Sequence, residues 1–225
     1  MLLLNVLVYS HAAHAAEVNQ EDQYGIYHDS DYTQRDPFER LNRKIFAFNH
    51  TLDRIVIKPV AKGYGAATPQ FIQSRIHNFF SNLLEPLNAI NALLQLKPKN
   101  FSITITRFII NSFWGIGGLH DVAKEAGLRY ESVGFDKTLK HYGVKTGPYI
   151  VLPIIGPSSV RGTAAFALDV ASDPFNHTDS KVFLRSRTGV STVDARVRIF
   201  PVTDLISKSS VDEYVTYRTL YFEQH

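Results

Sequence analysis

The chain contains no cysteine among its 225 residues. This absence excludes disulfide bonds, thiolate metal sites, a cysteine nucleophile and acylation or prenylation of a cysteine side chain. Beyond the N-terminus there is also no charge-free apolar run of about 18 residues, the length that a membrane-spanning helix needs. Any contact with a membrane therefore has to be made without a conventional spanning helix.

Motifs of metal and nucleotide chemistry are missing as well. The nine histidines are scattered and none belongs to an HExxH motif, so we expect no metal site. The glycine cluster at residues 115–118 lacks the GxGxxG spacing and the lysine of a phosphate-binding loop. These glycines are typical of a helix end where backbones approach closely. We therefore expect no cofactor.

A serine hydrolase is the enzymatic alternative. Ser158 has Gly156 two residues before it but Val160 two residues after it, so the GxSxG pattern of a nucleophile elbow is absent. A triad could still form from His120, Asp121 and a serine brought close by folding. Because no catalytic set is visible in the sequence, we expect a protein that is not an enzyme and has no catalytic residues.

The composition is that of a folded protein with moderate basic charge. It is 44% hydrophobic and 20% charged, with mean hydropathy −0.10, which excludes both a disordered chain and a polytopic membrane protein. The net charge of +3 suits an anionic lipid surface or a nucleic acid. The basic and aromatic residues near the C-terminus are better explained as cations and tyrosines at a membrane interface or on a solvated face, so we expect no nucleic-acid partner.

The N-terminus has the pattern of an export signal. An apolar run at residues 2–9 precedes Ala13-His14-Ala15, a small-x-small cleavage pattern, although no lysine or arginine occurs before Arg35. We predict a signal peptide at residues 1–15, cleaved after Ala15 with Ala16 as the second choice, and a flexible polar leader at 16–35. The remaining residues, 36–225, form the folded domain.

Hydrophobic periodicity predicts a mostly helical domain. Asp36 is expected to cap the first helix, which ends before Pro59, and a loop is expected at 63–69. Pro86 should kink or divide the second helix. The Ser210-x-x-Glu213 capping box should open the last one. The predicted helices are 36–58, 71–96, 101–114, 158–171 and 180–200, followed by the one from Ser210. Periodicity alone does not decide the segment 101–114, whose first six residues alternate like a strand, and its helical neighbours favour a helix.

Residues 143–161, GVKTGPYIVLPIIGPSSVR, are strongly apolar and carry no acidic residue. Gly147-Pro148, Pro153 and Gly156-Pro157 interrupt the stretch, so neither a long helix nor a central sheet strand can pass through it. Unpaired backbone groups are costly to bury. We therefore expect an irregular apolar segment beside a membrane or an apolar channel.

An ordered series of residues across the domain resembles the MlaA (VacJ) family of outer-membrane phospholipid-transport proteins. The series covers roughly residues 36–222 and is far more specific than any one of its motifs. Its clearest elements are Asp36-Pro37-Phe38-Glu39, Asn42-Arg43, Asn82, Arg107-Phe108, Gly115-x-Gly117-Gly118-Leu119-x-Asp121, Gly147-Pro148-Tyr149, Leu152-Pro153, Gly156-Pro157-Ser158, Arg161 and Asp212-x-Tyr214.

This resemblance implies a fold, a function and partners. The fold is an all-α, ring-shaped, monotopic membrane protein with a central amphipathic channel, in the inner leaflet of the outer membrane and facing the periplasm. Such a protein removes mislocalised phospholipids from the outer leaflet and passes them to the periplasmic carrier MlaC, beside a trimeric porin. The alternatives are a phospholipid hydrolase and a structural or adhesion module that moves no lipid.

The sequence departs from the family pattern at three places. Family members carry a lipidated cysteine at the cleavage site, which this sequence lacks, so we expect no lipid anchor. Gly162 follows Arg161 where an acidic residue is usual, and Asp136 replaces the glycine usual after Phe135.

Ten residues are candidates for the lipid channel or a hinge within it. Each has a structural alternative, because glycines allow close packing and asparagine and arginine make caps and buried hydrogen bonds. The candidates are Asn42, Arg43, Phe46, Asn49, Gly115, Gly117, Gly118, Pro148, Pro153 and Gly156.

Overall fold

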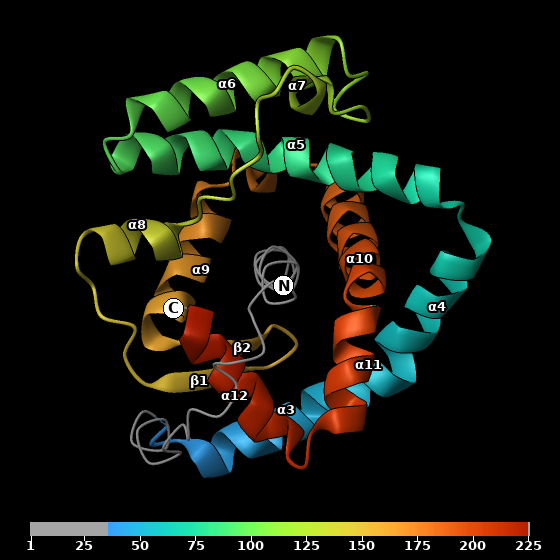
Figure 1. Ribbon diagram of the computed structural model, residues 1–225, viewed down its shortest axis with the longest axis vertical. Coiled ribbons are helices and arrows are strands. Elements are labelled where there is room, and N and C mark those ends of the chain that lie inside the picture. Colours follow the sequence, from blue (N-terminus) through green and yellow to red (C-terminus); the bar gives the residue numbers. More distant parts are fainter. Residues whose placement is uncertain (1–35, 225) are drawn as a thin grey trace, which may run out of the picture.

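The helices follow one another around a ring rather than packing on one central core (Figure 1). The computed structural model describes residues 36–224, so the predicted signal peptide and leader lie outside the described residues. The helices are α3 (Glu39–Leu52), α4 (Lys58–Ala67), α5 (Gln70–Leu94), α6 (Pro98–Phe113), α7 (Val122–Glu125), α8 (Phe135–His141), α9 (Val160–Ser172), α10 (Lys181–Arg198), α11 (Phe200–Ser209) and α12 (Glu213–Gln224).

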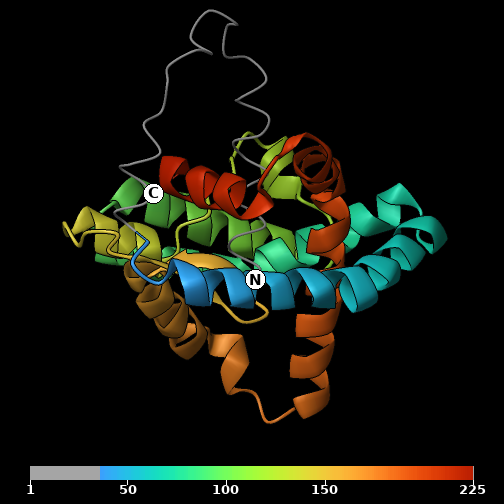
Figure 2. The ribbon, with the colours of Figure 1, turned by 90° about the horizontal axis from the view of Figure 1, so that it is seen from below.

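Two antiparallel helices, α5 and α6, form one side of the ring, and α4 and α3 lead from it to the opposite side. Figure 2 shows α9 and α10 projecting from one face of the ring, where a 3₁₀ turn at Pro174–His177 joins them, while α12 lies on the other face. Among residues 36–224, no helix is long and apolar enough to cross a membrane.

The first helical segment is longer than predicted. A π-helical turn, Asp53–Ile57, carries the chain from α3 into α4, so the predicted stop before Pro59 is wrong. Pro59 lies in the first turn of α4, where its missing N–H is tolerated because the π turn has already shifted the hydrogen-bond register. The predicted loop at 63–69 is also wrong, since α4 extends to Ala67 and Gly65 packs against Val197 of α10.

Asp36 does not cap α3 as predicted. Phe38 precedes the helix and provides no side-chain cap, while Asp36 is buried. The capping box at Ser210 is likewise wrong, because α12 begins at Glu213 and Asp212 Oδ1 accepts a hydrogen bond from the Val215 amide (3.3 Å).

The remaining helix predictions are mostly confirmed. α5 and α6 match the predicted segments, but α5 passes through Pro86 as one helix rather than two. The predicted segments 158–171 and 180–200 correspond to α9 and α10, which Ser159 and Ser180 cap. Periodicity did not predict α8 and α11, which are too short to show a clear pattern.

The apolar stretch at 143–161 contains a β-hairpin, which the sequence did not predict. β1 (Tyr149–Leu152) pairs antiparallel with β2 (Gly156–Ser159), with Tyr149 opposite Ser159 and Leu152 opposite Gly156. The proline argument excluded only a central strand, and Pro157 is tolerated because a two-stranded hairpin has two edges. The expectation of a wholly irregular segment is therefore wrong.

Candidate functional site

Two asparagines on α3 hold the outer edge of the hairpin. Asn42 Nδ2 donates to the Tyr149 carbonyl (3.1 Å), and Asn42 Oδ1 accepts from the Val151 amide (2.9 Å). One heptad later, Asn49 repeats the arrangement with the Leu152 carbonyl (2.9 Å) and the Ile154 amide (2.7 Å). Each side-chain amide replaces one residue of a third strand, which satisfies the hairpin backbone without a further strand.

A buried carboxylate anchors this arrangement. Asp36 accepts from Asn42 Nδ2 (2.8 Å) and from the Tyr214 hydroxyl, and Arg218 Nη1 lies 3.4 Å from it. Burial raises the pKa of Tyr214, and the nearby Asp36 carboxylate raises it further, so the phenol stays protonated and donates. Tyr149, Val151, Tyr214 and Tyr221 form the small apolar cluster beside it.

Arg43 and Phe46 connect α3 to α12 and to the residue that precedes it. Arg43 pairs with Glu39 (2.7 Å) and Asp212 (2.9 Å), and its guanidinium lies 4.4 Å from the centre of the Tyr214 ring. The Phe46 ring lies 5.6 Å from the ring centres of both Tyr214 and Tyr217.

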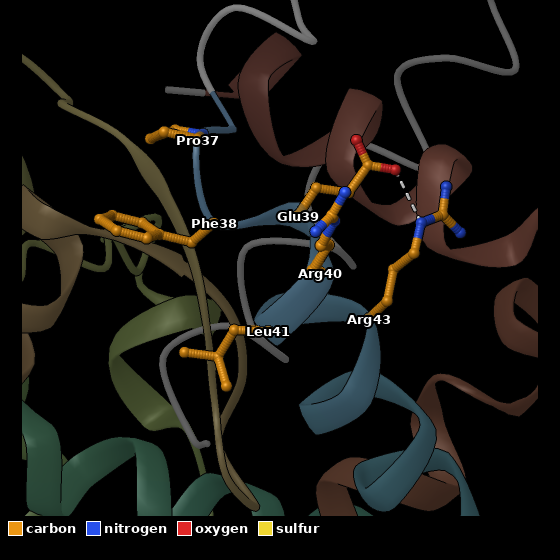
Figure 3. Close-up of a pocket in the computed structure, with 6 residues that line it drawn as sticks. All are labelled: Pro37, Phe38, Glu39, Arg40, Leu41 and Arg43. Atoms are coloured by element: carbon orange, nitrogen blue, oxygen red, sulfur yellow. Dashed lines mark hydrogen bonds and ion pairs between the residues drawn. The ribbon is translucent and has the colours of Figure 1, made fainter.

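A surface pocket opens beside the start of α3. Figure 3 shows its apolar side chains, Phe38 and Leu41, apart from the Glu39–Arg43 ion pair. The pocket is amphipathic, with Pro37 and Arg40 completing its lining.

The candidate hinge residues of the hairpin lie at its two ends. Pro148 precedes β1, and its carbonyl accepts from the Val160 amide that opens α9 (3.1 Å). Pro153 begins the turn between the strands, and Gly156 begins β2 with φ +99°, a conformation that favours glycine. The structure therefore brings Asn42 and Asn49 together with the segment that contains these three residues.

The glycine candidates lie elsewhere, at the α6–α7 connection on the opposite side of the ring (Figure 1). A Cβ added at Gly118 would lie 2.6 Å from Asn82 Cβ on α5, and one at Gly115 would lie 2.2 Å from the His120 carbonyl oxygen. A Cβ at Gly117 would meet nothing within 4 Å. Gly115 and Gly118 therefore permit close packing of this connection.

Arginine–carboxylate pairs join segments that are distant in the chain. In each pair the arginine side chain is largely buried, so the charge has left water and depends on its partner. Among the basic residues near the C-terminus, which were expected at a membrane interface or on a solvated face, Arg187 and Arg196 are buried, so that expectation is wrong for both. The pairs are Arg107–Glu85 (2.6 Å), Arg161–Asp136 (2.8 Å), Arg187–Asp173 (2.6 Å), Arg196–Asp53 (2.7 Å) and Arg218–Asp36 (3.4 Å).

Large apolar side chains, by contrast, face outward. On α3, Leu41 is 57% exposed and Phe48 is 53% exposed, whereas Asn42 is 1% exposed. The apolar residues that predicted an amphipathic helix thus lie largely outside the protein's own packing. The pattern continues around the ring at Ile55, Val60, Phe71, Leu93, Phe113, Trp114, Val182 and Leu205.

Three exposed apolar residues also adopt a left-handed backbone. Leu96, Ile116 and Ile154 have φ of 54°, 54° and 68°, and each lies in a connection between two elements. A bulky residue in this region costs on the order of 1–2 kcal/mol relative to its usual conformation. Because all three side chains are exposed, packing within residues 36–224 offsets little of that cost.

The residues proposed for a hydrolytic triad do not pair with one another. His120 contacts Arg75 through Nδ1 and Glu125 through Nε2 (2.8 Å). The Asp121 carboxylate instead binds Arg107 Nη2 (3.1 Å) and caps α7 through the Lys124 amide. Within the described part of the chain, no group of three histidines or carboxylates could hold a metal ion.

Sequence reasoning missed the central role of Asp36, which it interpreted as a helix cap, and of Tyr149, which it included only in the family resemblance. One signal was available, since two asparagines seven residues apart interrupt the apolar face of a helix. That spacing indicates side chains with a shared polar partner, although it does not identify the hairpin.

Comparisons with known proteins agree on one family. A 42% identical match over 185 residues links the chain to an uncharacterised protein of Rickettsia bellii, covering 82% of this chain and 72% of the relative. The intermembrane phospholipid transport system lipoprotein MlaA of Haemophilus influenzae is 34% identical over 194 residues, covering 84% and 77%. Its Escherichia coli counterpart is 34% identical over 197 residues, covering 84% and 76%.

A solved structure has the same fold. It comes from work on the structural basis for maintenance of bacterial outer membrane lipid asymmetry, and it superposes with a TM-score of 0.74 at 33% identity. The match covers 84% of this chain and 96% of that one. The family model for the MlaA lipoprotein matches residues 34–225, so this chain belongs to the MlaA lipoprotein family.

Proposed function

We propose that this protein transports phospholipids, removing those mislocalised in the outer leaflet of the outer membrane and passing them to a periplasmic carrier. The observation that carries the proposal is the distribution of side chains on the ring. Large apolar residues face outward, whereas several arginines and carboxylates lie buried between the elements, the reverse of what contact with water favours. Acyl chains around the ring would remove that mismatch.

The ring would sit in the inner leaflet, facing the periplasm, without spanning the membrane. Relatives named as parts of an intermembrane phospholipid transport system support this location. The trimeric porin and the carrier MlaC are the partners that the family resemblance suggests. Residues 1–15 would serve as the export signal.

The mechanism is passive and includes no covalent step. A headgroup would pass through the ring along polar side chains while the acyl chains stay against apolar walls. Asn42 and Asn49 would set the position of the hairpin at one side of this path, with Pro148, Pro153 and Gly156 as its bends. Arg43 and Phe46 would fix α12 beside it, and residues 115–118 would form the opposite wall.

Deletion of the gene in its host tests the proposal. Outer-leaflet phospholipid should rise in the deletion strain and return to normal when the wild-type gene is restored. An unchanged leaflet would contradict transport and favour a structural or adhesion role. Release of fatty acid from liposomes by the purified protein, lost on a single serine-to-alanine change, would favour a hydrolase instead.

A matched pair of variants tests the role of the hairpin. Asn49→Ala removes two hydrogen bonds to the hairpin turn, whereas Asn78→Ala removes one bond on α5, to the Leu119 carbonyl (3.4 Å). At equal protein levels, Asn49→Ala should change outer-leaflet phospholipid and Asn78→Ala should not. Equal behaviour of the two variants would contradict a role of the hairpin in the lipid path.

A further inference from the structure

One corner of the ring gathers lysines and exposed apolar residues from two helix ends. α5 ends beside α8, where Gln95 Nε2 donates to Thr138 Oγ1 (2.9 Å) and the Tyr142 hydroxyl donates to the Leu94 carbonyl. Figures 1 and 2 both show the C-terminal end of α5 next to α8. We call this region the lysine corner: Leu96 and Lys97 of the α5–α6 turn, Lys99 in the first turn of α6, and Lys140, Tyr142 and Lys145 at and after the end of α8.

The four lysines of the corner are exposed and have no carboxylate partner among the described residues. No ion pair joins Lys97, Lys99, Lys140 or Lys145 to residues 36–224. The nearby Asp136 is paired with Arg161 (2.8 Å). Positive charge thus accumulates here without internal compensation.

One acidic and one basic residue border the lysine corner without removing its excess of positive charge. Glu131 lies at its edge, where it accepts a hydrogen bond from Asn100 (2.9 Å). Lys137, on the same helix as Lys140, donates to the Ser132 carbonyl (2.7 Å). The corner therefore keeps an excess of positive charge even when its borders are included.

Compensation of helix dipoles explains only part of this charge. Lys140 lies in the last turn of α8, where a cation is favourable. Lys97 follows the C-terminal end of α5 but is also the N-cap residue of α6, so the two helix dipoles act on it in opposite directions. Lys99, however, lies in the first turn of α6, where a cation is unfavourable, and Lys145 lies beyond any helix end. An anionic ligand outside the protein would account for these two lysines.

Leu96 adds a second, independent observation. Its backbone has φ +54° directly after α5, and the Lys97 amide bonds to the Ala92 carbonyl (3.0 Å), which closes the helix as a Schellman motif. The adjacent helix α8 ends with Gly143 in the same left-handed region (φ +78°), the residue that this position favours. Leu96 therefore occupies a strained position with its side chain 79% exposed, as expected if that side chain enters an apolar phase.

We propose that the lysine corner docks on the anionic phospholipids of the leaflet, with the lysines at the phosphate groups and Leu96 among the acyl chains. This inference rests on the proposed function for its membrane, and it adds a preference for anionic over zwitterionic lipid. Lysines on an exposed apolar surface are the combination that an anionic bilayer attracts.

Vesicle binding by the full chain tests the corner. The protein is diluted from detergent onto vesicles of phosphatidylcholine alone or of phosphatidylcholine with phosphatidylglycerol, and the bound fraction is measured by co-sedimentation at low and high salt. We expect tighter binding to the anionic vesicles, with the difference shrinking at high salt because screening weakens surface attraction.

Two sets of glutamine substitutions distinguish the effect of the lysine corner on binding from the effect of the protein's net charge. Substitution of Lys97, Lys99, Lys140 and Lys145 should weaken binding to anionic vesicles on the order of several hundredfold, since each of the four lysines near such a surface contributes roughly fivefold. Substitution of Lys44, Lys62, Lys124 and Lys181, which lie elsewhere on the ring, removes the same charge. This second variant should keep most of the preference for anionic vesicles. Equal loss in both sets, or a preference that survives the corner substitutions, would overturn the proposal.

Leu96→Gly separates membrane insertion from folding. Glycine relieves the left-handed strain, so thermal stability in detergent should not fall, while binding to anionic vesicles should weaken by roughly tenfold or more because a leucine side chain leaves the acyl phase. Unchanged binding would overturn the role of Leu96. Equal binding to both vesicle types would refute only the corner, whereas no binding to any vesicle would also count against the membrane location in the proposed function.

Discussion

Asn42 provides a direct test of the hairpin arrangement, because alanine at this position removes three buried hydrogen bonds together. The bonds join the side-chain amide to the Asp36 carboxylate, the Tyr149 carbonyl and the Val151 amide. Asn49 serves as the matched control, since it makes the same two kinds of backbone contact, one heptad later, in a half-exposed position.

The expected magnitudes follow from burial. Asn42 is 1% exposed, so water cannot replace its amide, and each buried group left without a partner costs about 1–3 kcal/mol. We therefore expect Asn42→Ala to lower the free energy of unfolding by about 3–5 kcal/mol, a large share of a typical domain's stability. Asn49→Ala should cost only about 1 kcal/mol, because water can reach the exposed backbone groups.

Denaturant unfolding in detergent micelles, followed by circular dichroism, measures both losses. Hydrogen exchange at the Val151 amide gives a local readout, and protection there should fall in Asn42→Ala and persist in Asn49→Ala. Similar losses for the two variants, or a loss below about 1 kcal/mol for Asn42→Ala, would show that burial of these bonds does not hold the hairpin in place.

Three further predictions use single substitutions. Gly118→Ala should destabilise the protein by about 3 kcal/mol or more, because its Cβ would lie 2.6 Å from Asn82 Cβ, whereas Gly117→Ala, with open space, should cost about 1 kcal/mol in the same unfolding assay. Burial raises the pKa of the Asp169 carboxyl from 3.8 to about 6, so the native state binds this proton more tightly than the unfolded state does. The stability that this proton contributes is present below pH 4 and is lost as the pH rises to 6. Asp169→Asn should make the free energy of unfolding less dependent on pH in this window and should raise it by up to about 3 kcal/mol above pH 6. Gly156→Leu, at φ +99°, should lower the melting temperature through backbone strain of about 1–2 kcal/mol, and an unchanged melting temperature would contradict that conformation.

Periodicity predicted the long helices because the information lies within each segment. The predicted segments 71–96 and 180–200 correspond to α5 and α10, since apolar residues recur there at helical spacing. It failed at Pro59, where a π turn upstream makes a proline compatible with a continuing helix. Local sequence rules consider each proline by itself and do not take into account the hydrogen-bond register of the helix before it.

The hairpin and its anchors could not be predicted from local sequence. Asn42 and Val151 are separated by 109 positions, and the strands exist because side chains from α3 satisfy their outer edge. The family resemblance selected Asn42, but it did not indicate what the amide binds. The buried Asp36 illustrates the same limit, since its position before a helix is typical of a cap and its burial depends on Tyr214 and Arg218 from the other end of the chain.

In a ring of helices, the contacts between neighbouring helices must be determined without one apolar core that all of them share. The apolar cluster around Tyr149 serves only one part of the ring, and many leucine, isoleucine and phenylalanine side chains face outward, where water would not favour them. Buried ion pairs such as Arg107–Glu85 and Arg196–Asp53 are weak sources of net stability, because desolvation offsets most of their attraction. They are, however, directional, and a mispaired junction would leave a buried charge without a partner. We infer that these pairs select the order in which the helices close, while the surrounding lipid, rather than an internal core, provides the apolar environment for the outer face.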